Sequence, residues 1–344
     1  MSEKKLIELF NNILINKTYT DISTELNVSK GTINRWILHN NIPPLYRFDL
    51  MKLNNSKIDY SKYSYKEKDQ FFTDKETSKY CFEIFKKKLI ELKEDINIYN
   101  FIEPSAGDGS FLLVLPNDRT IAFDIEPRHK DIIQQDYLSW KPNDNKKYIV
   151  FGNPPFGLRG HLALKFINHS NKFADYVCFI LPQLFESDGK GVPRKRVKGF
   201  KLIHSEQINS KFYYPDKKNI KINCLFQIWS KYYDDDKYKI NNIINLNIKV
   251  YSISDGGTSS TTRNKKMLNK CDIYLPSTCF GKENMKYYET FDTLYNKKGY
   301  GIVFLNNKKE NLIKFKNIKW DEIAFLSTNS AFNIRTSQIT ELFK

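Results

Sequence analysis

The chain has 344 residues, which is enough for two or three domains with a hydrophobic core each. Lysine and arginine number 55 against 39 aspartates and glutamates, so the formal charge is +16 and a polyanionic partner such as nucleic acid is expected. We find no run of about 18 apolar residues and no signal-peptide pattern, and therefore expect a cytoplasmic protein. The five cysteines are odd in number and form no CxxC pair, which argues against a disulfide framework and a zinc site.

Residues 1–50 are predicted to be helical and to bind DNA. Two short helices are expected around a tight turn at Asn27, and the second should bury Ile33, Trp36 and Ile37. The pattern D-I-x-x-x-L-x-V-S-x-x-T-I-x-R-W resembles helix-turn-helix modules. A helical bundle for protein contacts is the alternative. In a DNA-binding module, the second helix would present Lys30, Asn34 and Arg35.

The rest of the chain is predicted to hold a linker and two further domains. Residues 51–69 are polar with isolated tyrosines and are interpreted as a linker, and residues 233–344 as a smaller α+β domain. Between them, residues 70–232 begin with a helix at 74–92 and then alternate strands and helices, which predicts a doubly wound, mostly parallel α/β sheet. The strands are expected at 99–102, 120–123, 148–151, 174–181 and 224–229.

A glycine turn, EPSAGDGS (103–110), joins the first strand to a helix expected to begin near Ser110. A dinucleotide-binding loop would need glycine where Leu112 stands, and Glu103 and Asp108 would repel a pyrophosphate. S-adenosylmethionine carries a sulfonium and an ammonium group and no phosphate. It therefore suits this loop better than a dinucleotide does.

Acidic residues follow the next two strand ends. Asp124, 21 positions after Glu103, can accept hydrogen bonds from two ribose hydroxyls. Asp136 can accept one from the adenine amine of the same cofactor. The loop and the two acids stand at successive strand ends, and together they predict a site for S-adenosylmethionine.

The stretch FGNPPFG (151–157) ends a strand in a rigid turn, because two prolines cannot continue a strand or a helix. The side-chain oxygen of Asn153 and the carbonyl oxygen of Pro154 can then converge on a group with two N–H donors. An amine on a planar ring is such a group, and Phe156 could stack on that ring. A base in a duplex reaches this turn only after it is flipped out, which costs a few kcal/mol.

EPSAGDGSF followed 50 positions later by NPPF resembles the amino-methyltransferases that depend on S-adenosylmethionine, especially the N6-adenine DNA methyltransferases of the γ arrangement. The resemblance covers residues 70–232 and implies a Rossmann-like methyltransferase domain. It implies methylation of adenine N6 at a specific sequence in double-stranded DNA. The implied catalytic residues are Asn153, Pro154, Pro155 and Phe156. The implied cofactor-binding residues are Phe72, Thr73, Glu103, Pro104, Ser105, Ala106, Gly107, Asp108, Gly109, Asp124, Ile125, Asp136 and Tyr137.

The same resemblance implies weaker assignments outside these motifs. Tyr214, with Phe212 and Tyr213 beside it, would stack on the other face of the flipped base. The loop 188–201 would contact DNA phosphates through Arg194, Lys195 and Arg196. Residues 233–344 show no signature of the family and are interpreted as the target-recognition domain from their position and length alone. A cognate restriction endonuclease is a conceivable partner. Transfer from a sulfonium needs no metal, so none is expected.

One departure from the family and three alternatives accompany this hypothesis. Asp74 stands where the family commonly has proline. NPPF followed by glycine also resembles methyltransferases that act on adenine or guanine amino groups of RNA, and NPPY relatives methylate glutamine amides in proteins. A non-catalytic DNA-binding regulator is the third alternative. The predicted helix-turn-helix favours DNA over RNA and protein.

Overall fold

The computed structural model describes residues 3–26, 28–187, 192–208, 211–220, 222–238, 245–255, 262–290, 298–326 and 331–343. These residues form two compact units, which are treated separately. The first unit comprises Met1–Phe185 and Arg196–Tyr238, and the second Glu186–Lys195 and Lys239–Lys344. The predicted turn residue Asn27 and residues 188–191 of the predicted phosphate-contacting loop lie outside the described residues.

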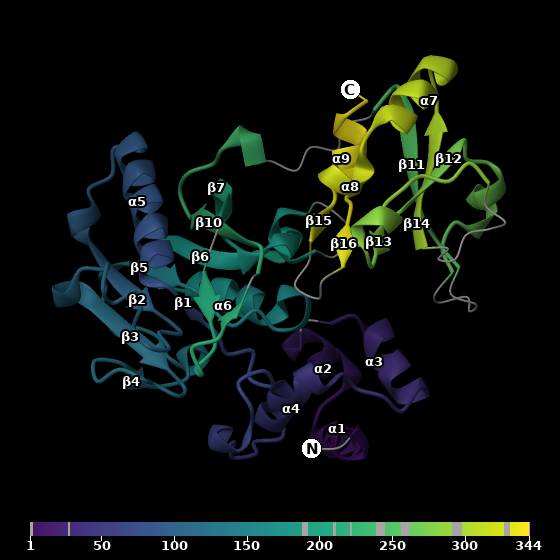
Figure 1. Ribbon diagram of the computed structural model, residues 1–344. Helices are drawn as coiled ribbons and strands as arrows, with labels where there is room; N and C mark the ends of the chain where they lie inside the picture. Colours follow the sequence, from purple (N-terminus) through teal and green to yellow (C-terminus); the bar gives the residue numbers. More distant parts are fainter. Residues whose placement is uncertain are drawn as a thin grey trace. The chain divides into compact units, whose positions relative to one another are not determined.

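A seven-stranded sheet with the order β4-β3-β2-β5-β6-β10-β7 forms the centre of the first unit (Figure 1). The first five strands in this order are parallel, and β10 pairs antiparallel with both β6 and β7. The prediction of a mixed α/β fold with a mostly parallel sheet is confirmed. The strands are β2 (Tyr99–Glu103), β3 (Thr120–Asp124), β4 (Ile133–Gln134), β5 (Lys147–Gly152), β6 (Tyr176–Pro182), β7 (Lys201–Ile208) and β10 (Cys224–Ser230).

The order of the strands determines where a ligand can bind. The chain adds β3 and β4 on one side of β2 and then returns to place β5 on the other side. The loops that leave β2 and β5 therefore diverge, and a crevice opens at the carboxyl ends of these strands. The glycine turn follows β2 and the NPPF turn follows β5.

Helices cover both faces of this sheet (Figure 1). α5 (Lys75–Glu91), whose N-terminus is capped by Asp74, packs Phe82 and Phe85 against Phe151 of β5. α6 (His161–Ser170) packs its apolar side into the cluster on the other face, which includes Val150. Strands β6 and β10 are buried along their whole length because they are covered on both faces.

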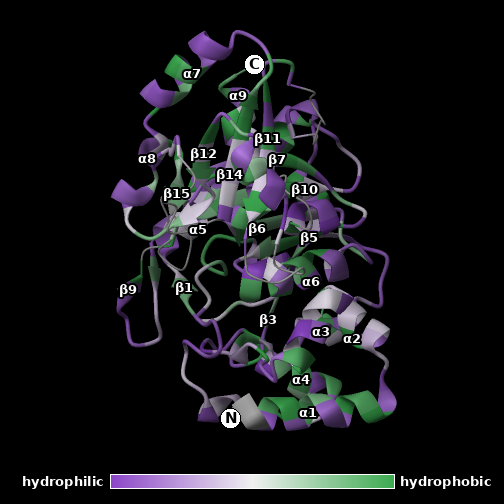
Figure 2. Cartoon of the chain, turned by 90° about the vertical axis from the view of Figure 1, so that its right-hand side faces the viewer, coloured by the Kyte–Doolittle hydropathy of each residue, from purple (hydrophilic) through white to green (hydrophobic). Residues whose placement is uncertain are grey.

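Four helices precede the sheet: α1 (Glu3–Asn16), α2 (Tyr19–Glu25), α3 (Lys30–Leu38) and α4 (Arg47–Leu53). Hydrophobic and polar stretches alternate along α1, as expected of a half-buried helix (Figure 2). Ile33 and Trp36 of α3 are buried as predicted, but Ile37 is 41% exposed. The prediction for Ile37 is wrong because each helical residue is turned by about 100° from the one before it, which moves Ile37 off the buried stripe.

α4 attaches these helices to the sheet. The two carboxylate oxygens of Asp49 lie 2.9 Å from His161 Nε2 and 2.9 Å from Lys165 Nζ, both on α6. The Tyr46 ring lies 5.1 Å from the His161 ring, and Leu158 packs against the helical core. The helical segment is therefore packed onto the sheet, and α4 crosses the predicted domain boundary at residue 50.

The helix expected to begin near Ser110 is not formed. Residues 107–114 fold as successive turns, in which the backbone N–H groups of Val114 and Leu115 both donate to the Phe111 carbonyl. Gly107 and Gly109 have φ values of +56° and +87°, so a helix could begin no earlier than Ser110. Pro116 follows so soon that too few residues remain to repay the cost of helix nucleation.

The second unit contains antiparallel sheets and short helices. Strands β11 (Ile248–Ser254), β14 (Lys298–Phe304) and β12 (Ile273–Pro276) form one three-stranded sheet, and β13 (Thr278–Cys279), β16 (Phe332–Asn333) and β15 (Phe325–Leu326) form another. Its core includes Ile302, Phe315 and Trp320. The helices are α7 (Lys308–Asn317), α8 (Trp320–Ile323) and α9 (Thr336–Glu341). Across the described part of the chain, each helix is too short or too polar to cross a membrane.

The Asp49 ion pairs should stabilise the first unit in a pH-dependent way. Burial alone would raise the pKa of Asp49, but the His161 hydrogen bond and the Lys165 charge lower it to about 2. Because the pKa of Asp49 is lower in the folded chain than its unfolded value of 3.8, its ionisation stabilises the fold at pH values above 3.8. This stabilisation is lost as the pH falls toward 2. We expect Asp49→Asn to lower the free energy of unfolding by about 2 kcal/mol at pH 7.

Urea unfolding between pH 7 and pH 2 would measure this difference, which should shrink between pH 4 and pH 2. The control is Asp59→Asn, which removes an ion pair with Lys62 that is exposed on both sides. Equal losses of stability in the two variants would contradict the prediction.

Candidate active site

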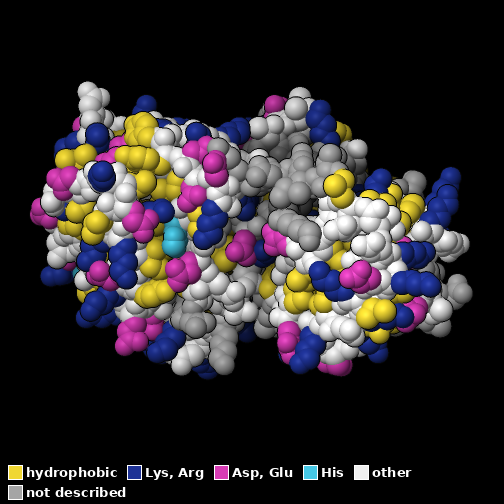
Figure 3. Space-filling view, turned by 90° about the horizontal axis from the view of Figure 1, so that it is seen from above, with side chains coloured by type: hydrophobic (Ala, Val, Ile, Leu, Met, Phe, Trp, Pro, Cys, Tyr) yellow, Lys and Arg dark blue, Asp and Glu magenta, His cyan; other side chains and the backbone are white. Residues whose placement is uncertain are grey.

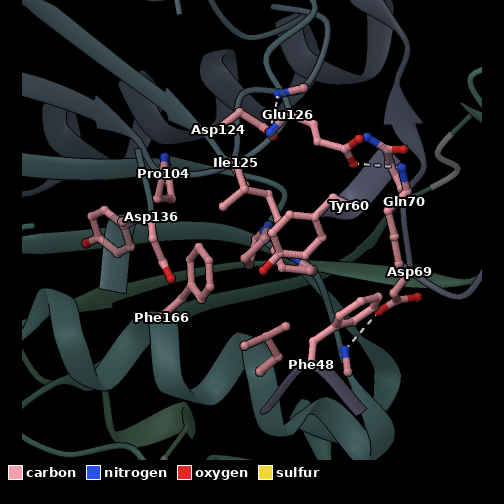
Figure 4. Close-up of a pocket in the computed structure, with 18 of the residues that line it drawn as sticks. Phe48, Tyr60, Asp69, Gln70, Pro104, Asp124, Ile125, Glu126, Asp136 and Phe166 are labelled. Carbon is pink, nitrogen blue, oxygen red and sulfur yellow. Dashed lines mark hydrogen bonds and ion pairs between the residues drawn. The ribbon is translucent and has the colours of Figure 1, made fainter. Parts of the chain in front are cut away.

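A cavity of about 160 Å³ lies at the crevice between β2 and β5 (Figure 4). A smaller cavity of about 20 Å³ adjoins it and is lined by Thr73, Glu103, Asp108 and Asn153, among others. The predicted cofactor-binding residues all line one of the two cavities, except Gly109. Thr73, Glu103, Ala106 and Asp108 line the smaller one, and Phe72, Ser105 and Gly107 line both. Pro104, Asp124, Ile125, Asp136 and Tyr137 line the larger one.

The glycine turn is tightly packed against its neighbours. Gly107 has φ +56°, and a Cβ atom there would lie 2.8 Å from the Phe72 ring. Its backbone N–H donates to Asp124 Oδ2 at 2.8 Å, so the turn is held against the end of β3. Gly107 is therefore required both by its backbone conformation and by the lack of space for a side chain.

Three carboxylates surround the turn. Glu103 is 1% exposed, and its Oε2 has no hydrogen-bond partner among the described residues. Burial and the nearby charges of Asp124 and Asp108 raise the pKa of Glu103 well above its usual value. Burial also raises the pKa of Asp124, although the N–H groups of Glu126 and Gly107 donate to its two oxygens. A cationic ligand group would relieve the repulsion between these carboxylates.

Asn153 is held with its side-chain oxygen unpaired. Its Nδ2 donates to Thr73 Oγ1 at 3.1 Å, and its backbone carbonyl accepts a hydrogen bond from Ser105 Oγ at 3.1 Å. Asn153 Oδ1 is buried and has no hydrogen-bond partner in the described part of the chain. Thr73 lies on β1 (Phe72–Thr73), which pairs with β8 (Phe212–Tyr213). An acceptor without a donor therefore remains at the cavity wall, next to Pro154 and Pro155.

The rings predicted to stack on a substrate have different surroundings. Phe156 is 5% exposed and packs edge-on against Phe71, with ring centroids 5.3 Å apart, so it does not line the larger cavity. The Tyr214 ring is half-buried and lies 4.7 Å from the Tyr65 ring. Tyr213, by contrast, donates its hydroxyl to Asp108. Stacking of Phe156 on a base stays a prediction and requires the ring to be uncovered.

Several residues of the cavity were not found by sequence reasoning. Lys52 Nζ lies 2.6 Å from Asp136 Oδ2, and Lys68 Nζ lies 2.7 Å from Glu126 Oε2. Asp69 accepts a hydrogen bond from the Gly157 N–H at 2.8 Å, which fixes the end of the NPPF turn. Burial raises the pKa of Asp69. These contacts join residues 58 to 88 positions apart, so no local pattern could reveal them.

The residues predicted to contact DNA belong to different units of the chain. Lys30, Asn34 and Arg35 are exposed on α3. Arg194 and Lys195 belong to the second unit and Arg196 to the first. On the face drawn in Figure 3, lysine and arginine side chains are scattered among acidic ones. Within the described ranges, no three histidine, cysteine or acidic side chains are grouped as metal ligands would be.

The chain was compared with known proteins. No model of a protein family matches it, and no curated protein matches it. Among solved structures, it is similar to a presumed RNA methyltransferase from Pyrococcus horikoshii, at 19% identity over 47% of this chain and 86% of that one, with a TM-score of 0.35. It is similar to the modification subunit of a presumed type I restriction enzyme from Vibrio vulnificus, at 10% identity over 65% and 60% of the two chains, with a TM-score of 0.31.

A third similar structure is an S-adenosylmethionine-dependent methyltransferase from Clostridium acetobutylicum, with 11% identity, coverage of 76% of this chain and 97% of that one, and a TM-score of 0.23. Likenesses of this size carry no argument about activity.

Because of the conformation of Gly107, alanine substitutions at Gly107 and at Gly31 should change the free energy of unfolding in opposite directions. We expect Gly107→Ala to lower the free energy of unfolding by about 1–2 kcal/mol, because a side chain is disfavoured at positive φ and would meet the Phe72 ring. The control is Gly31→Ala on α3, where the nearest atom to a new Cβ is 3.8 Å away. Alanine there should stabilise the helix by about 0.5–1 kcal/mol. Thermal unfolding of both variants measures the two effects, and a loss of similar size in both would contradict the prediction.

Proposed function

We propose that the protein transfers a methyl group from S-adenosylmethionine to the N6 amine of a flipped adenine in DNA. The observation that carries the proposal is the unpaired Asn153 Oδ1, which is held at the cavity by the Thr73 hydrogen bond. A buried acceptor without a donor is costly, so such an atom is expected to have a ligand partner. An amine on a planar ring supplies the missing N–H.

The charges around the cavity suit the proposed cofactor. S-adenosylmethionine supplies an activated methyl group on a sulfonium. Glu103 and Asp108 would attract the cationic methionine end, and Phe72 and Thr73 would line it. Asp124 would hold the ribose hydroxyls, because a carboxylate that accepts two backbone N–H bonds still has lone pairs to offer.

The NPPF turn would act on the substrate amine. Asn153 Oδ1 and the Pro154 carbonyl would accept hydrogen bonds from the two N–H groups, which would localise the nitrogen lone pair for attack on the methyl group. The N–CH3 bond would form as the S–CH3 bond breaks, S-adenosylhomocysteine would leave, and the methylated nitrogen would then lose one proton to solvent. This attack needs no free base in advance. The Asp69 bond to Gly157 and the two prolines keep the acceptors in place, so little reorganisation is needed during the reaction. Phe156 and Tyr214 would hold the two faces of the base.

DNA is the proposed substrate because of the charge of the chain and its N-terminal helices. The formal charge is +16, and Lys30, Asn34 and Arg35 are exposed on α3, where they would meet a duplex. Arg194, Lys195 and Arg196 would add phosphate contacts, and residues 233–344 would contribute sequence recognition. Within this proposal, a cognate restriction endonuclease would be a conceivable partner.

Asn153→Ala provides the direct test of the reaction. We expect the rate of methyl transfer to fall by about 10²–10³-fold, because one preorganised hydrogen-bond partner of the reacting group is removed. The affinity for S-adenosylmethionine should stay nearly unchanged. The assay uses labelled S-adenosylmethionine with a mixed pool of DNA, RNA and protein, followed by mass spectrometry of the methylated product.

Two controls complete this test. Asn41→Ala changes an exposed asparagine of the same unit and should keep full activity. Methylation of RNA or of glutamine amides instead of DNA would overturn the substrate. Loss of cofactor binding in Asn153→Ala would mean that the turn has only a structural role.

The role of α3 is tested by its charges. We expect the double variant Lys30→Ala, Arg35→Ala to bind duplex DNA more weakly and to lower the slope of log affinity against log salt by about one for each phosphate that is no longer neutralised. Deletion of residues 1–50 is unsuitable, because it would also remove Asp49. The matched control removes two other exposed lysines, Lys62 and Lys66. Equal slopes in the two double variants would mean that α3 does not bind DNA.

A further inference from the structure

The N-terminal helices contribute one wall of the larger cavity. The lining of this cavity includes Phe48, Asp49 and Lys52 of α4 and Leu45, which precedes α4. Tyr60, from the loop after α4, also lines it. Figure 4 shows the Phe48 and Tyr60 side chains projecting toward the same space as Ile125 and Asp136. The cavity is thus built from two parts of the chain that are far apart in sequence.

Lys52 contacts Asp136, the residue predicted to accept a hydrogen bond from the adenine amine of the cofactor. Its Nζ is 2.6 Å from Asp136 Oδ2, while Asp136 Oδ1 accepts a hydrogen bond from the Leu138 N–H at 3.1 Å. Burial lowers the pKa of Lys52, but the charge of Asp136 more than offsets this, so the net direction is upward. Lys52 is therefore cationic at neutral pH and fixes the Asp136 carboxylate, whose oxygens can still accept another hydrogen bond.

Two aromatic rings complete this wall. The centroids of the Phe48 and Tyr60 rings are 5.3 Å apart, and Tyr63 packs edge-on against Phe48 at 4.9 Å. Both Phe48 and Tyr60 are half-buried and line the cavity. Tyr60 and Asp136 line the same cavity, and Figure 4 shows their side chains at the same space. A planar base is a suitable partner for rings held in this way.

The wall is fixed to the rest of the unit at several points. Asp49 is only 12% exposed and pairs with His161 and Lys165. Arg47 pairs with Glu67 and lies 5.4 Å from the centre of the Tyr63 ring. Farther along, Lys68 is 9% exposed and pairs with Glu126, next to Asp124. Because these contacts are buried on at least one side, they hold α4 and its loop at the cavity.

We propose that α4 and its following loop are part of the cofactor site, with Tyr60 and Phe48 covering the adenine ring and Lys52 positioning Asp136 for the adenine amine. This inference rests on the proposed use of S-adenosylmethionine. It assigns the N-terminal helices a second role besides contact with nucleic acid, because the cofactor site is incomplete without them.

The test is calorimetric titration of the full chain with S-adenosylmethionine and, separately, with adenosine. We expect Lys52→Met to weaken both affinities by roughly tenfold, because Asp136 loses its charged partner. Tyr60→Leu and Phe48→Leu should each weaken them by roughly three- to tenfold through the loss of an aromatic face. Lys52→Arg restores a cation and should recover most of the affinity.

The controls are Lys62→Met and Tyr19→Leu, which change an exposed lysine and an exposed tyrosine of the same N-terminal region and should bind as the wild type does. The unfolding temperature of each ligand-free variant shows whether it is folded. Lys52 is half-exposed, so its variants test the proposal even if an aromatic variant does not fold.

The outcomes separate this inference from the proposed function. If the wild type does not bind S-adenosylmethionine, the proposed function fails and this inference fails with it. If the wild type binds and the folded variants bind equally well, only this inference is overturned. Tighter binding by Lys52→Met would also overturn it, since Lys52 would then compete with adenine for Asp136. Weaker binding of S-adenosylmethionine with unchanged binding of adenosine would overturn the placement at the adenine end.

Discussion

The reversal of strand order between β2 and β5 is the constraint on which the site depends. The strand order continues from β2 to β3 on one side and from β5 to β6 on the other, so the connections that leave β2 and β5 diverge and leave the space at their carboxyl ends open. The glycine turn and the NPPF turn both lie there, and β1 supplies Thr73 to orient Asn153. The polar groups of the site converge because of the topology of the sheet, although they are distant in sequence.

The sequence predicted five strands of the seven-stranded sheet, because these are apolar runs with clear ends, as in the buried strands β5 and β10. It missed β4, which has two exposed residues, and β7, whose burial pattern is irregular. It failed for the segment after the glycine turn, where a helix was expected to begin near Ser110. The positive φ values at Gly107 and Gly109 and the position of Pro116 leave too few residues for a helix there. Ile37 illustrates a second limit, since one position on a helix decides between burial and exposure.

The candidate site was predictable where a residue type and its position at a strand end agree, as for Asp124 and Asn153. The contributions of Lys52, Tyr60 and Asp69 were not predictable, because they depend on how α4 and its loop pack against the sheet. An ion pair between residues 84 positions apart has no periodicity to detect. Polar composition suggested a linker at 51–69, yet several of its side chains line the cavity.

The attachment of α4 to α6 also has a geometric consequence. Since the Asp49 ion pairs fix α4, and α1 and α3 share one core with α4, the exposed side of α3 keeps a constant distance and angle from Asn153. A long molecule bound along α3 would therefore reach the cavity at a fixed interval from its contacts with α3. The length of the segment between α3 and α4 would set that interval.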